Sequence, residues 1–353
     1  MDHYSTLEVD GGHSIPVPVP NTSLPEAFNG AEHSQVYYQD NALDIWMADW
    51  NGSSSTWTNY PVLAKDNARA ILPKNGTPIA AYNWFSINNT GNQTNRTWSD
   101  FRCVFIDDTN IIHAFEALNQ SISEWHTLAI FDDVLATSEN SSLVGYTPPC
   151  GNDTCDASDF LVFESSKGNL WIQYPHSGGS SGEFLPDGVD GTDSGTAMAV
   201  TPIYARINAT TDARMPQITM YLVYEGTLVE ITGTRGKAWR RSGPGLRDNK
   251  FVDSGAQLAA MSHVTDGLIY TEVLVTRSDG GVAMAYYDQN QQHWLTTERV
   301  EGMENVLPLS PIAATQAGHV YALENGSQIV EWKLVAGKHP PEFERVAVVD
   351  THS

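Results

Sequence analysis

A pattern of strand, tight turn, strand and tryptophan recurs along this chain and restricts how it can fold. The segment 221–239, YLVYEGTLVEITGTRGKAW, shows it best, with two apolar runs around Glu225-Gly226 and a lone Trp239. We interpret it as a β-hairpin followed by an edge strand that carries the tryptophan. Similar segments begin at Val36, Phe160, Val273 and Val320, and a degenerate one begins at Arg102.

A short strand of small residues precedes the copies and completes the repeat. Examples are GTPIAAYNW from Gly76, GTAMAVTPIY from Gly195 and AQLAAMSH from Ala256, and for the first copy we expect residues 28–33 in this position. Small residues suit the innermost strand of a propeller blade, where the blades converge. Four short strands repeated at roughly 50 residues are the signature of a β-propeller. A two-sheet sandwich is the alternative, but it would not repeat the small-residue strand. The sequence therefore predicts an all-β fold, a single-domain six-bladed β-propeller.

The predicted blades divide the chain without a linker or a shift in composition. Residues 1–25 include the proline-rich IPVPVP, and we expect an extended arm there that completes the last blade and closes the propeller, which spans 26–353. The blades are expected at 26–75, 76–138, 139–193, 194–253, 254–305 and 306–353.

An excess of acidic residues limits the classes of partner. The chain has 19 Lys and Arg against 42 Asp and Glu, a formal net charge of −23. Phosphate binding needs basic residues gathered on one surface, so we expect neither nucleic acid nor an anionic membrane as partner. No apolar run approaches the ~20 residues of a transmembrane helix. The sequence also lacks zinc, calcium and P-loop signatures, so we expect no metal and no cofactor.

Glycosylation sequons indicate the compartment. Asn-x-Ser/Thr occurs more often than chance supplies, which predicts an N-glycosylated protein of the secretory pathway or the cell exterior. The sequons begin at Asn21, Asn51, Asn75, Asn88, Asn92, Asn95, Asn119, Asn140, Asn152, Asn208 and Asn325.

The three cysteines fit that compartment. Cys150 and Cys155 enclose a short polar loop, and we predict a local disulfide between them. Cys103 lies in the apolar segment FRCVFI, where we expect a buried thiol.

The repeats resemble those of the fungal fucose-specific lectins, six-bladed propellers with sugar sites between blades. The resemblance implies an arginine opening the second strand, a glutamate ending the third, and a Trp or Tyr covering the apolar sugar face. Carried over in this way, no blade keeps both charged residues. These positions hold Gln35 and Ile45, Arg102 and His113, Phe160 and Ile172, Met220 and Glu230 with Trp239, Glu272 and Met284, and His319 and Glu331.

A lectin-like scaffold with incomplete sugar sites also resembles the fungal hetero-Diels–Alderases of tropolonic sesquiterpene biosynthesis. The resemblance implies a pericyclase that joins a quinone-methide-like diene to a terpene alkene. Such a [4+2] cycloaddition needs no nucleophile, metal or cofactor. It needs small apolar substrates held face to face and a donor on the carbonyl of the heterodiene. This is the leading functional hypothesis from the sequence.

Bulky and polar residues occur where the inner strands end and the second strands begin, and we expect them to ring the central cavity. The alternative is that they plug the channel. The candidate catalytic donors are Arg102, Tyr204 and His263. The candidate substrate-binding residues are Tyr82, Trp84, Tyr146, Arg206, Arg214 and Tyr270.

Other functions stay open. A glycan-binding lectin with altered specificity would have shallow sites between blades, and a secreted adaptor would expose a large apolar patch. A glycosidase would need paired acids such as Asp107-Asp108 or Asp132-Asp133, but both pairs fall at predicted turns, where Asp is favoured. In each case we expect a monomer or a homodimer.

Overall fold

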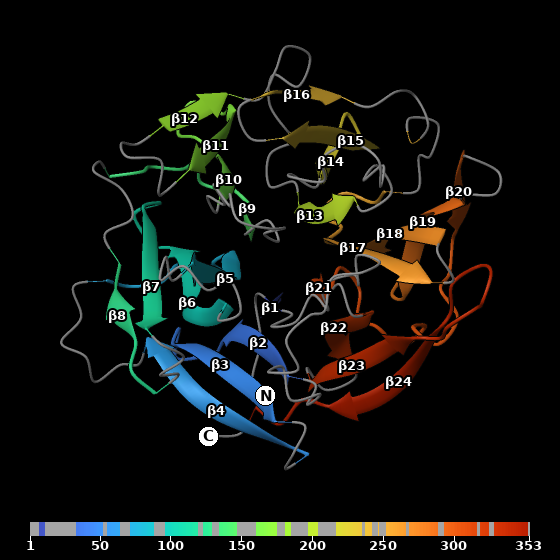
Figure 1. Ribbon diagram of the computed structural model, residues 1–353, viewed down its shortest axis with the longest axis horizontal. Coiled ribbons are helices and arrows are strands. Elements are labelled where there is room, and N and C mark those ends of the chain that lie inside the picture. The colour runs from blue at the N-terminus through green and yellow to red at the C-terminus, as the bar shows by residue number, and fades with distance from the viewer. Residues whose placement is uncertain are drawn as a thin grey trace.

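The strands of the chain form a ring of six sheets, which confirms the predicted six-bladed β-propeller (Figure 1). Each sheet has four antiparallel strands that are consecutive in sequence. The computed structural model describes residues 7–10, 33–51, 55–63, 71–87, 96–118, 123–128, 134–146, 160–174, 181–184, 197–203, 217–234, 237–241, 246, 252–265, 268–288, 293–315, 318–324 and 328–351. Among these residues, no helix has the length and hydropathy that a membrane span requires.

Each blade runs from an inner strand at the axis to an outer strand at the rim (Figure 1). Blade 1 contains β1 (Leu7–Asp10), β2 (His33–Gln39), β3 (Ile45–Asn51) and β4 (Thr56–Leu63), and blade 2 contains β5 (Ile79–Ile87), β6 (Arg96–Ile106), β7 (Ile112–Leu118) and β8 (His126–Thr127). Blade 3 contains β9 (Leu143–Tyr146), β10 (Phe160–Glu164), β11 (Leu170–Tyr174) and β12 (Ser181–Phe184), and blade 4 contains β13 (Met198–Ile203), β14 (Gln217–Tyr224), β15 (Thr227–Thr234) and β16 (Lys237–Arg241). Blade 5 contains β17 (Leu258–Thr265), β18 (Leu268–Thr276), β19 (Val282–Asp288) and β20 (His293–Thr297), and blade 6 contains β21 (Ile312–Ala314), β22 (His319–Glu324), β23 (Gln328–Leu334) and β24 (Phe343–Val348).

The N-terminal strand β1 belongs to the first blade. It pairs with β2, with Leu7 opposite Tyr38 and Asp10 opposite Gln35. It therefore takes the inner position expected for residues 28–33, and it does not add a strand to the last blade as the sequence analysis expected. Blade 6 is complete without it, because β21 already fills the inner position there.

The hydrophobic core lies between neighbouring blades, because alternate residues of each strand face the blade before and the blade after. The interface of blades 3 and 4 shows how tightly they pack. Phe160 lies edge-on to Trp239, with ring centroids 5.9 Å apart. Gly233 lies under the same indole, and a Cβ at this glycine would be 2.4 Å from Trp239 Cδ2. The small residue at position 233 is therefore required by packing.

Aspartates organise the turns between second and third strands in blades 1 and 2. Asp40 Oδ1 accepts the N–H groups of Ala42 and Asp44, at 2.9 and 2.8 Å. Asp107 does the same in blade 2, and its Oδ2 lies 2.8 Å from His113 Nε2. Burial raises the pKa of the Asp107 carboxyl, but the hydrogen bonds from Ile111, His113 and Thr109 outweigh it, so the pKa lies below its usual value. Asp107 thus serves the turn, as expected for an Asp at this position.

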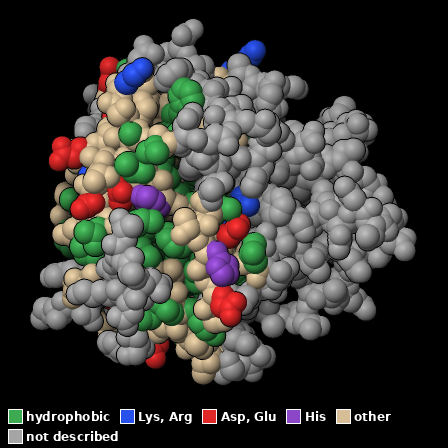
Figure 2. All heavy atoms as spheres, turned by 90° about the vertical axis from the view of Figure 1, so that its left-hand side faces the viewer, with side chains coloured by type: hydrophobic (Ala, Val, Ile, Leu, Met, Phe, Trp, Pro, Cys, Tyr) green, Lys and Arg blue, Asp and Glu red, His purple; other side chains and the backbone are tan. Residues whose placement is uncertain are grey.

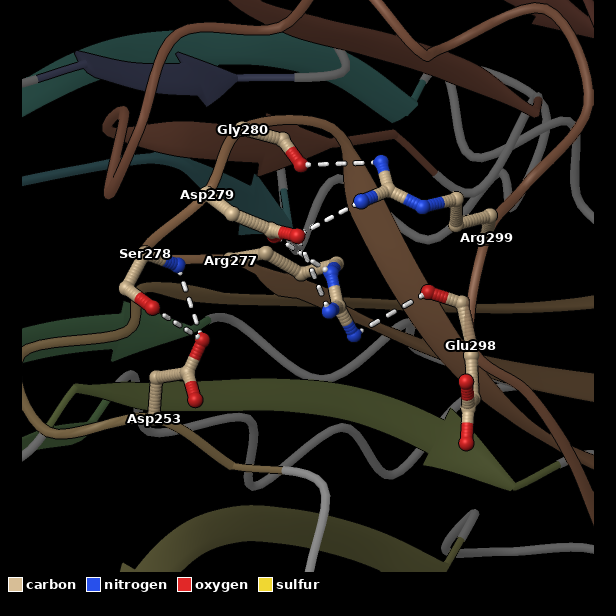
Figure 3. A network of polar contacts seen from close by, with 7 residues as sticks. All are labelled: Asp253, Arg277, Ser278, Asp279, Gly280, Glu298 and Arg299. Carbon is tan, nitrogen blue, oxygen red and sulfur yellow. Dashed lines mark hydrogen bonds and ion pairs between the residues drawn. The ribbon is translucent and has the colours of Figure 1, made fainter.

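A network of charged side chains closes one corner of blade 5 (Figure 3). Asp279 accepts from two arginines, Arg277 Nε at 2.8 Å and Arg299 Nη2 at 2.6 Å. Asp253, from the segment before β17, accepts from the backbone N–H and the hydroxyl of Ser278, both at 2.8 Å. The network therefore ties together the start of the blade, the β18–β19 turn and the end of β20.

Blades 6 and 1 meet where the two ends of the chain come together, and we call this interface the seam. Val36, Tyr38 and Ala48 of blade 1 share a buried cluster with residues of blade 6, including Tyr321. The segment after β24 then crosses to blade 1. Asn59 Nδ2 donates to the carbonyl of Asp350 at 2.9 Å, and the Tyr38 hydroxyl donates to the carbonyl of Thr351 at 3.3 Å. No strand among those described is exchanged across the seam.

Candidate binding sites between the blades

Polar side chains recur on the blade faces at one end of the sheets, where second strands begin and third strands end. The strand register defines two rows. The first row holds directly opposed pairs: Gln35 and Asp49, Arg102 and Glu116, Thr219 and Thr232, Glu272 and Tyr286, and His319 and Lys333. The second row holds the third-strand residues two positions nearer the turn: Met47, Ala114, Ile172, Glu230, Met284 and Glu331.

This register corrects three positions carried over from the lectin resemblance. Met47 and Ala114, rather than Ile45 and His113, are the equivalents of Glu331. Thr219, rather than Met220, is the equivalent of His319, because it lies two residues before the tyrosine that opposes the glutamate. His113 is far from this row, since it binds Asp107 at the opposite end of the blade.

The most complete cluster lies at the seam. Glu331 Oε1 is 2.6 Å from His319 Nδ1, and it accepts from the Tyr321 hydroxyl at 3.1 Å. The His319 and Glu331 side chains are only 4% and 9% exposed. A buried carboxylate is tolerated only with such partners. We call Glu331, His319, Tyr321 and the two tryptophans that face them from blade 1 the seam site.

Blade 1 supplies an aromatic wall to the seam site. Trp57 of β4 meets Tyr321 edge-on, with centroids 6.3 Å apart and planes at 89°. Trp50 of β3 packs on Trp57 at 5.4 Å. Both indoles are half-buried, so the wall keeps some exposed aromatic surface.

Two polar atoms of the seam site have no hydrogen-bond partner among the described residues. The indole N–H of Trp57 is buried and donates to none of them. Both hydrogen bonds of Glu331 go to Oε1, and Oε2 receives none from this part of the chain. A buried donor of blade 1 thus remains to be satisfied in the interface that also holds the carboxylate of blade 6.

The interface of blades 1 and 2 has a related arrangement, in which Gln35 takes the place of His319. The Tyr37 hydroxyl donates to Gln35 Oε1 at 3.0 Å, and Gln35 Nε2 donates to Asp49 Oδ1 at 3.1 Å. Trp125 of blade 2 meets Tyr37 edge-on, at 6.1 Å and 88°. Asp49 and Trp125 were not predicted as site residues, although a carboxylate at the end of β3 was a signal present in the sequence.

Arg102 has a glutamate partner, Glu116, at a position other than the one that the lectin resemblance implies, because Ala114 is the equivalent of Glu331 in blade 2. Its Nη2 lies 4.0 Å from Glu116 Oε2, and its side chain is 2% exposed. Tyr82, directly opposite on β5, is also buried and packs against Gly145 of blade 3. Both predicted site residues therefore belong to the interface of blades 2 and 3.

Aromatic residues fill the interface of blades 3 and 4. The Trp239 indole donates to the Tyr174 hydroxyl at 3.2 Å, and Tyr146 packs on Phe160 at 5.9 Å. Tyr146, a predicted substrate-binding residue, is thus part of this aromatic interface. In the next interface, Tyr221 faces Trp294 at 5.9 Å.

The structure describes the side chain of only one of the remaining predicted site residues, Tyr270. Tyr270 is half-buried, with its ring 5.3 Å from that of His339. Trp84 and His263 lie in β5 and β17, but their side chains are outside the described residues. Tyr204, Arg206 and Arg214 lie outside them altogether. The central-cavity site therefore stays a prediction.

The predicted modifications are likewise only partly covered. Cys103 is buried and outside any disulfide, as expected, whereas Cys150 and Cys155 lie beyond the described residues. Asn75 and Asn140 are exposed, and Asn51 ends β3. The other sequons fall outside the described ranges. Within those ranges, no three His, Cys, Asp or Glu side chains gather as a metal site.

Charge is spread rather than concentrated on the side of the disc that carries blades 2 and 3. Figure 2 shows acidic side chains scattered among polar and hydrophobic ones, with a few lysines and arginines between them. No basic stripe of the kind that binds phosphate appears among the side chains coloured there.

Solved structures of fungal fucose-specific lectins share this fold. The fucose-specific lectin from Aleuria aurantia aligns with a TM-score of 0.69 and 18% identity, over 92% of this chain and 93% of that one. A mutant form of that lectin in complex with Fucα1-6GlcNAc gives 0.68 and 17%, over 99% and 96% of the two chains. AofleA from Arthrobotrys oligospora gives 0.64 and 14%, over 90% and 83%. No family model and no curated protein sequence matches the chain. At these identities the likeness shows the fold.

Proposed function

We propose that this protein is a lectin that binds a carbohydrate between adjacent blades, first of all at the seam site. The observation that carries the proposal is the buried, unpaired indole N–H of Trp57, which lies in the same interface as the Glu331 carboxylate and half-buried aromatic surface.

Sugar chemistry matches this set of groups. A pyranose presents hydroxyls that both donate and accept, next to an apolar face of C–H groups. A hydroxyl can donate to Glu331 Oε2 while another accepts from Trp57 Nε1, and the C–H face can cover the indoles. Leaving a buried polar group unpaired costs about 1–3 kcal/mol, so a ligand that pairs it recovers that free energy.

The ligand need not be fucose. The Aleuria aurantia lectin is fucose-specific and its mutant form is seen in complex with Fucα1-6GlcNAc, but the seam site has His319 where the resemblance implies an arginine. An arginine offers five N–H donors in a fixed fork, and an imidazole offers at most two. We therefore expect a preference that differs from that of an arginine site.

The experiment is a glycan panel followed by titration calorimetry with the best ligand. Glu331→Gln should weaken binding tenfold or more, about the contribution of a hydrogen bond to a charged group. Trp57→Phe keeps a ring but removes the N–H, and should weaken binding about fivefold. Glu324→Gln is the control, because Glu324 lies at the turn end of β22 and pairs with Arg345. Absence of glycan binding, or equal affinities for all four proteins, would exclude this function.

The cycloaddition hypothesis is the second candidate. What favours it is the interface of blades 3 and 4, where the aromatic rings of Tyr146, Phe160 and Trp239 pack together among aliphatic side chains. Its test is the product ratio from a quinone-methide-like heterodiene and a terpene alkene, measured against the uncatalysed reaction. Arg102 lies in the neighbouring interface of blades 2 and 3, so if it is the donor, the reaction takes place there and Arg102→Ala should lower turnover by about 10²–10³. Unchanged products in the presence of the wild-type protein would exclude this candidate.

A further inference from the structure

The seam is held differently from the other five interfaces of the ring. Consecutive blades are joined by the chain itself, as when residues 64–78 connect β4 to β5. Blades 6 and 1 are the last and the first in sequence, and no described strand of one pairs with a strand of the other. Within the described part of the chain, the contacts that close the ring are therefore side-chain packing and a few hydrogen bonds.

Asn59 is central to those hydrogen bonds. It donates through Nδ2 to the Asp350 carbonyl at 2.9 Å and accepts through Oδ1 from the Tyr38 hydroxyl at 3.1 Å. The Thr351 carbonyl lies 3.3 Å from the same Tyr38 hydroxyl, so it shares the single hydroxyl proton with Asn59 Oδ1. The two side chains together fasten the end of the chain onto blade 1.

The seam site lies on the same interface and has walls on both blades. Trp57 is two residues from Asn59 on β4, so both side chains point to the same face of the sheet. Glu331, His319 and Tyr321 belong to blade 6. When the seam opens, the acceptor and the aromatic wall move apart and the site no longer exists.

We infer that ligand binding at the seam site and closure of the propeller ring are coupled, and that Asn59 is a positioning residue for this site. The inference rests on the proposed function. A ligand that contacts both blades binds only the closed ring and so suppresses its opening, in proportion to 1 + [ligand]/Kd. A looser seam lowers the apparent affinity by the fraction of rings that remain closed.

Two buried positions allow opening to be measured by thiol labelling. Ala48 is buried in the seam, so Ala48→Cys reports on this interface. Cys103 is buried in the interface of blades 1 and 2, which the chain connects, and serves as an internal control. Labelling rates with a small thiol reagent are read separately for the two thiols by mass spectrometry. The ligand is the best glycan of the panel.

With glycan at 100 Kd, labelling at position 48 should slow about 100-fold, while labelling of Cys103 by local opening should change little. Asn59→Leu should speed labelling at position 48 and raise Kd.

Gln39→Leu is the matched control. Gln39 also makes two hydrogen bonds, to the Lys74 carbonyl and from the Gly76 N–H at 3.0 Å each, but across the interface of blades 1 and 2. The Gln39→Leu variant should speed labelling of Cys103 and leave the Kd for the glycan unchanged.

The outcomes separate the two ideas. If wild-type protein binds no glycan, the proposed function is wrong and the coupling falls with it. If glycan binds but does not slow labelling at position 48, only the coupling is wrong. Equal effects of Asn59→Leu and Gln39→Leu on Kd and on both thiols would also overturn it, because they would indicate a general loss of stability.

Discussion

Trp57 and Tyr321 meet at a right angle across the seam, with ring centroids 6.3 Å apart. The same edge-on contact joins Tyr37 to Trp125 at 6.1 Å and Tyr221 to Trp294 at 5.9 Å, in two other interfaces. In each pair, the second strand of one blade supplies the tyrosine and the next blade in the ring supplies the tryptophan. The recurring tryptophan of the sequence therefore holds neighbouring blades together, which explains why it recurs even where the charged residues beside it do not.

Gly233→Ala should destabilise the protein by about 1–3 kcal/mol, the usual range for an overpacked core. The added methyl group would lie 2.4 Å from Trp239 Cδ2, and the indole has little room to move because it is buried against Phe160. Urea unfolding measures the change. The double variant Gly233→Ala with Trp239→Leu should lose less free energy of unfolding than the sum of the two single variants. Strict additivity would count against the packing explanation.

Removal of Arg102 should destabilise blade 2. Arg102→Ala leaves the partly buried Glu116 without its counter-charge and also opens a void, so we expect a loss of about 3 kcal/mol. The double variant with Glu116→Gln should recover part of that loss in thermal or urea unfolding. If it does not, the 4.0 Å ion pair contributes nothing and the loss comes from packing alone.

The charged network at the corner of blade 5 should make the free energy of unfolding depend on pH. The Arg277 guanidinium holds the pKa of Asp279 below its usual value, and the two hydrogen bonds from Ser278 do the same for Asp253. Their folded-state pKa values are lower than in the unfolded chain, so their stabilising effect is present above about pH 4. It is lost as the pH falls through the folded-state values.

As the pH is lowered from about 5 to 3, the melting temperature of the wild-type protein should therefore fall more than that of Asp279→Asn or Asp253→Asn. Carboxyls of this kind titrate in that range. The variants should melt lower at neutral pH, and the curves should converge in acid. Glu344→Gln, on the exposed side of β24, is the control and should follow the wild-type curve. Parallel curves for all four proteins would contradict this account.

Asn75 and Asn140 should carry glycans when the protein is made in a eukaryotic secretory host. Both are exposed, and their loops lie close together because Lys74 Nζ contacts the carbonyl of Glu139. Peptide mapping after glycosidase treatment tests each site. Secretion without modification at either position would argue against the predicted compartment.

The repeats predicted the fold because each blade is a local unit. A hairpin, a small-residue strand and a tryptophan lie within one stretch of sequence, and the six sheets follow those stretches. The first inner strand was misplaced because Leu7–Asp10 is short, partly acidic and separated from β2 by 22 residues (11–32). Nothing in its local pattern distinguishes it from a loop.

The candidate sites were harder to predict because they depend on register. The β14–β15 turn has two residues, Glu225 and Gly226, whereas the β2–β3 turn spans Asp40 to Asp44. The directly opposed pair is therefore 13 residues apart in blade 4 (Thr219 and Thr232) but 14 apart in blade 1 (Gln35 and Asp49), and the sequence alone does not show which residues oppose one another. The ion pair of Arg102 with Glu116 and the hydrogen bond of Gln35 with Asp49 appear only once the strands are aligned.

Each of the six blades contains its own four strands, so the fold does not depend on which blade comes first in the sequence. A gene in which the coding order starts at another blade would still encode the same six units, with a different pair of neighbours left unjoined.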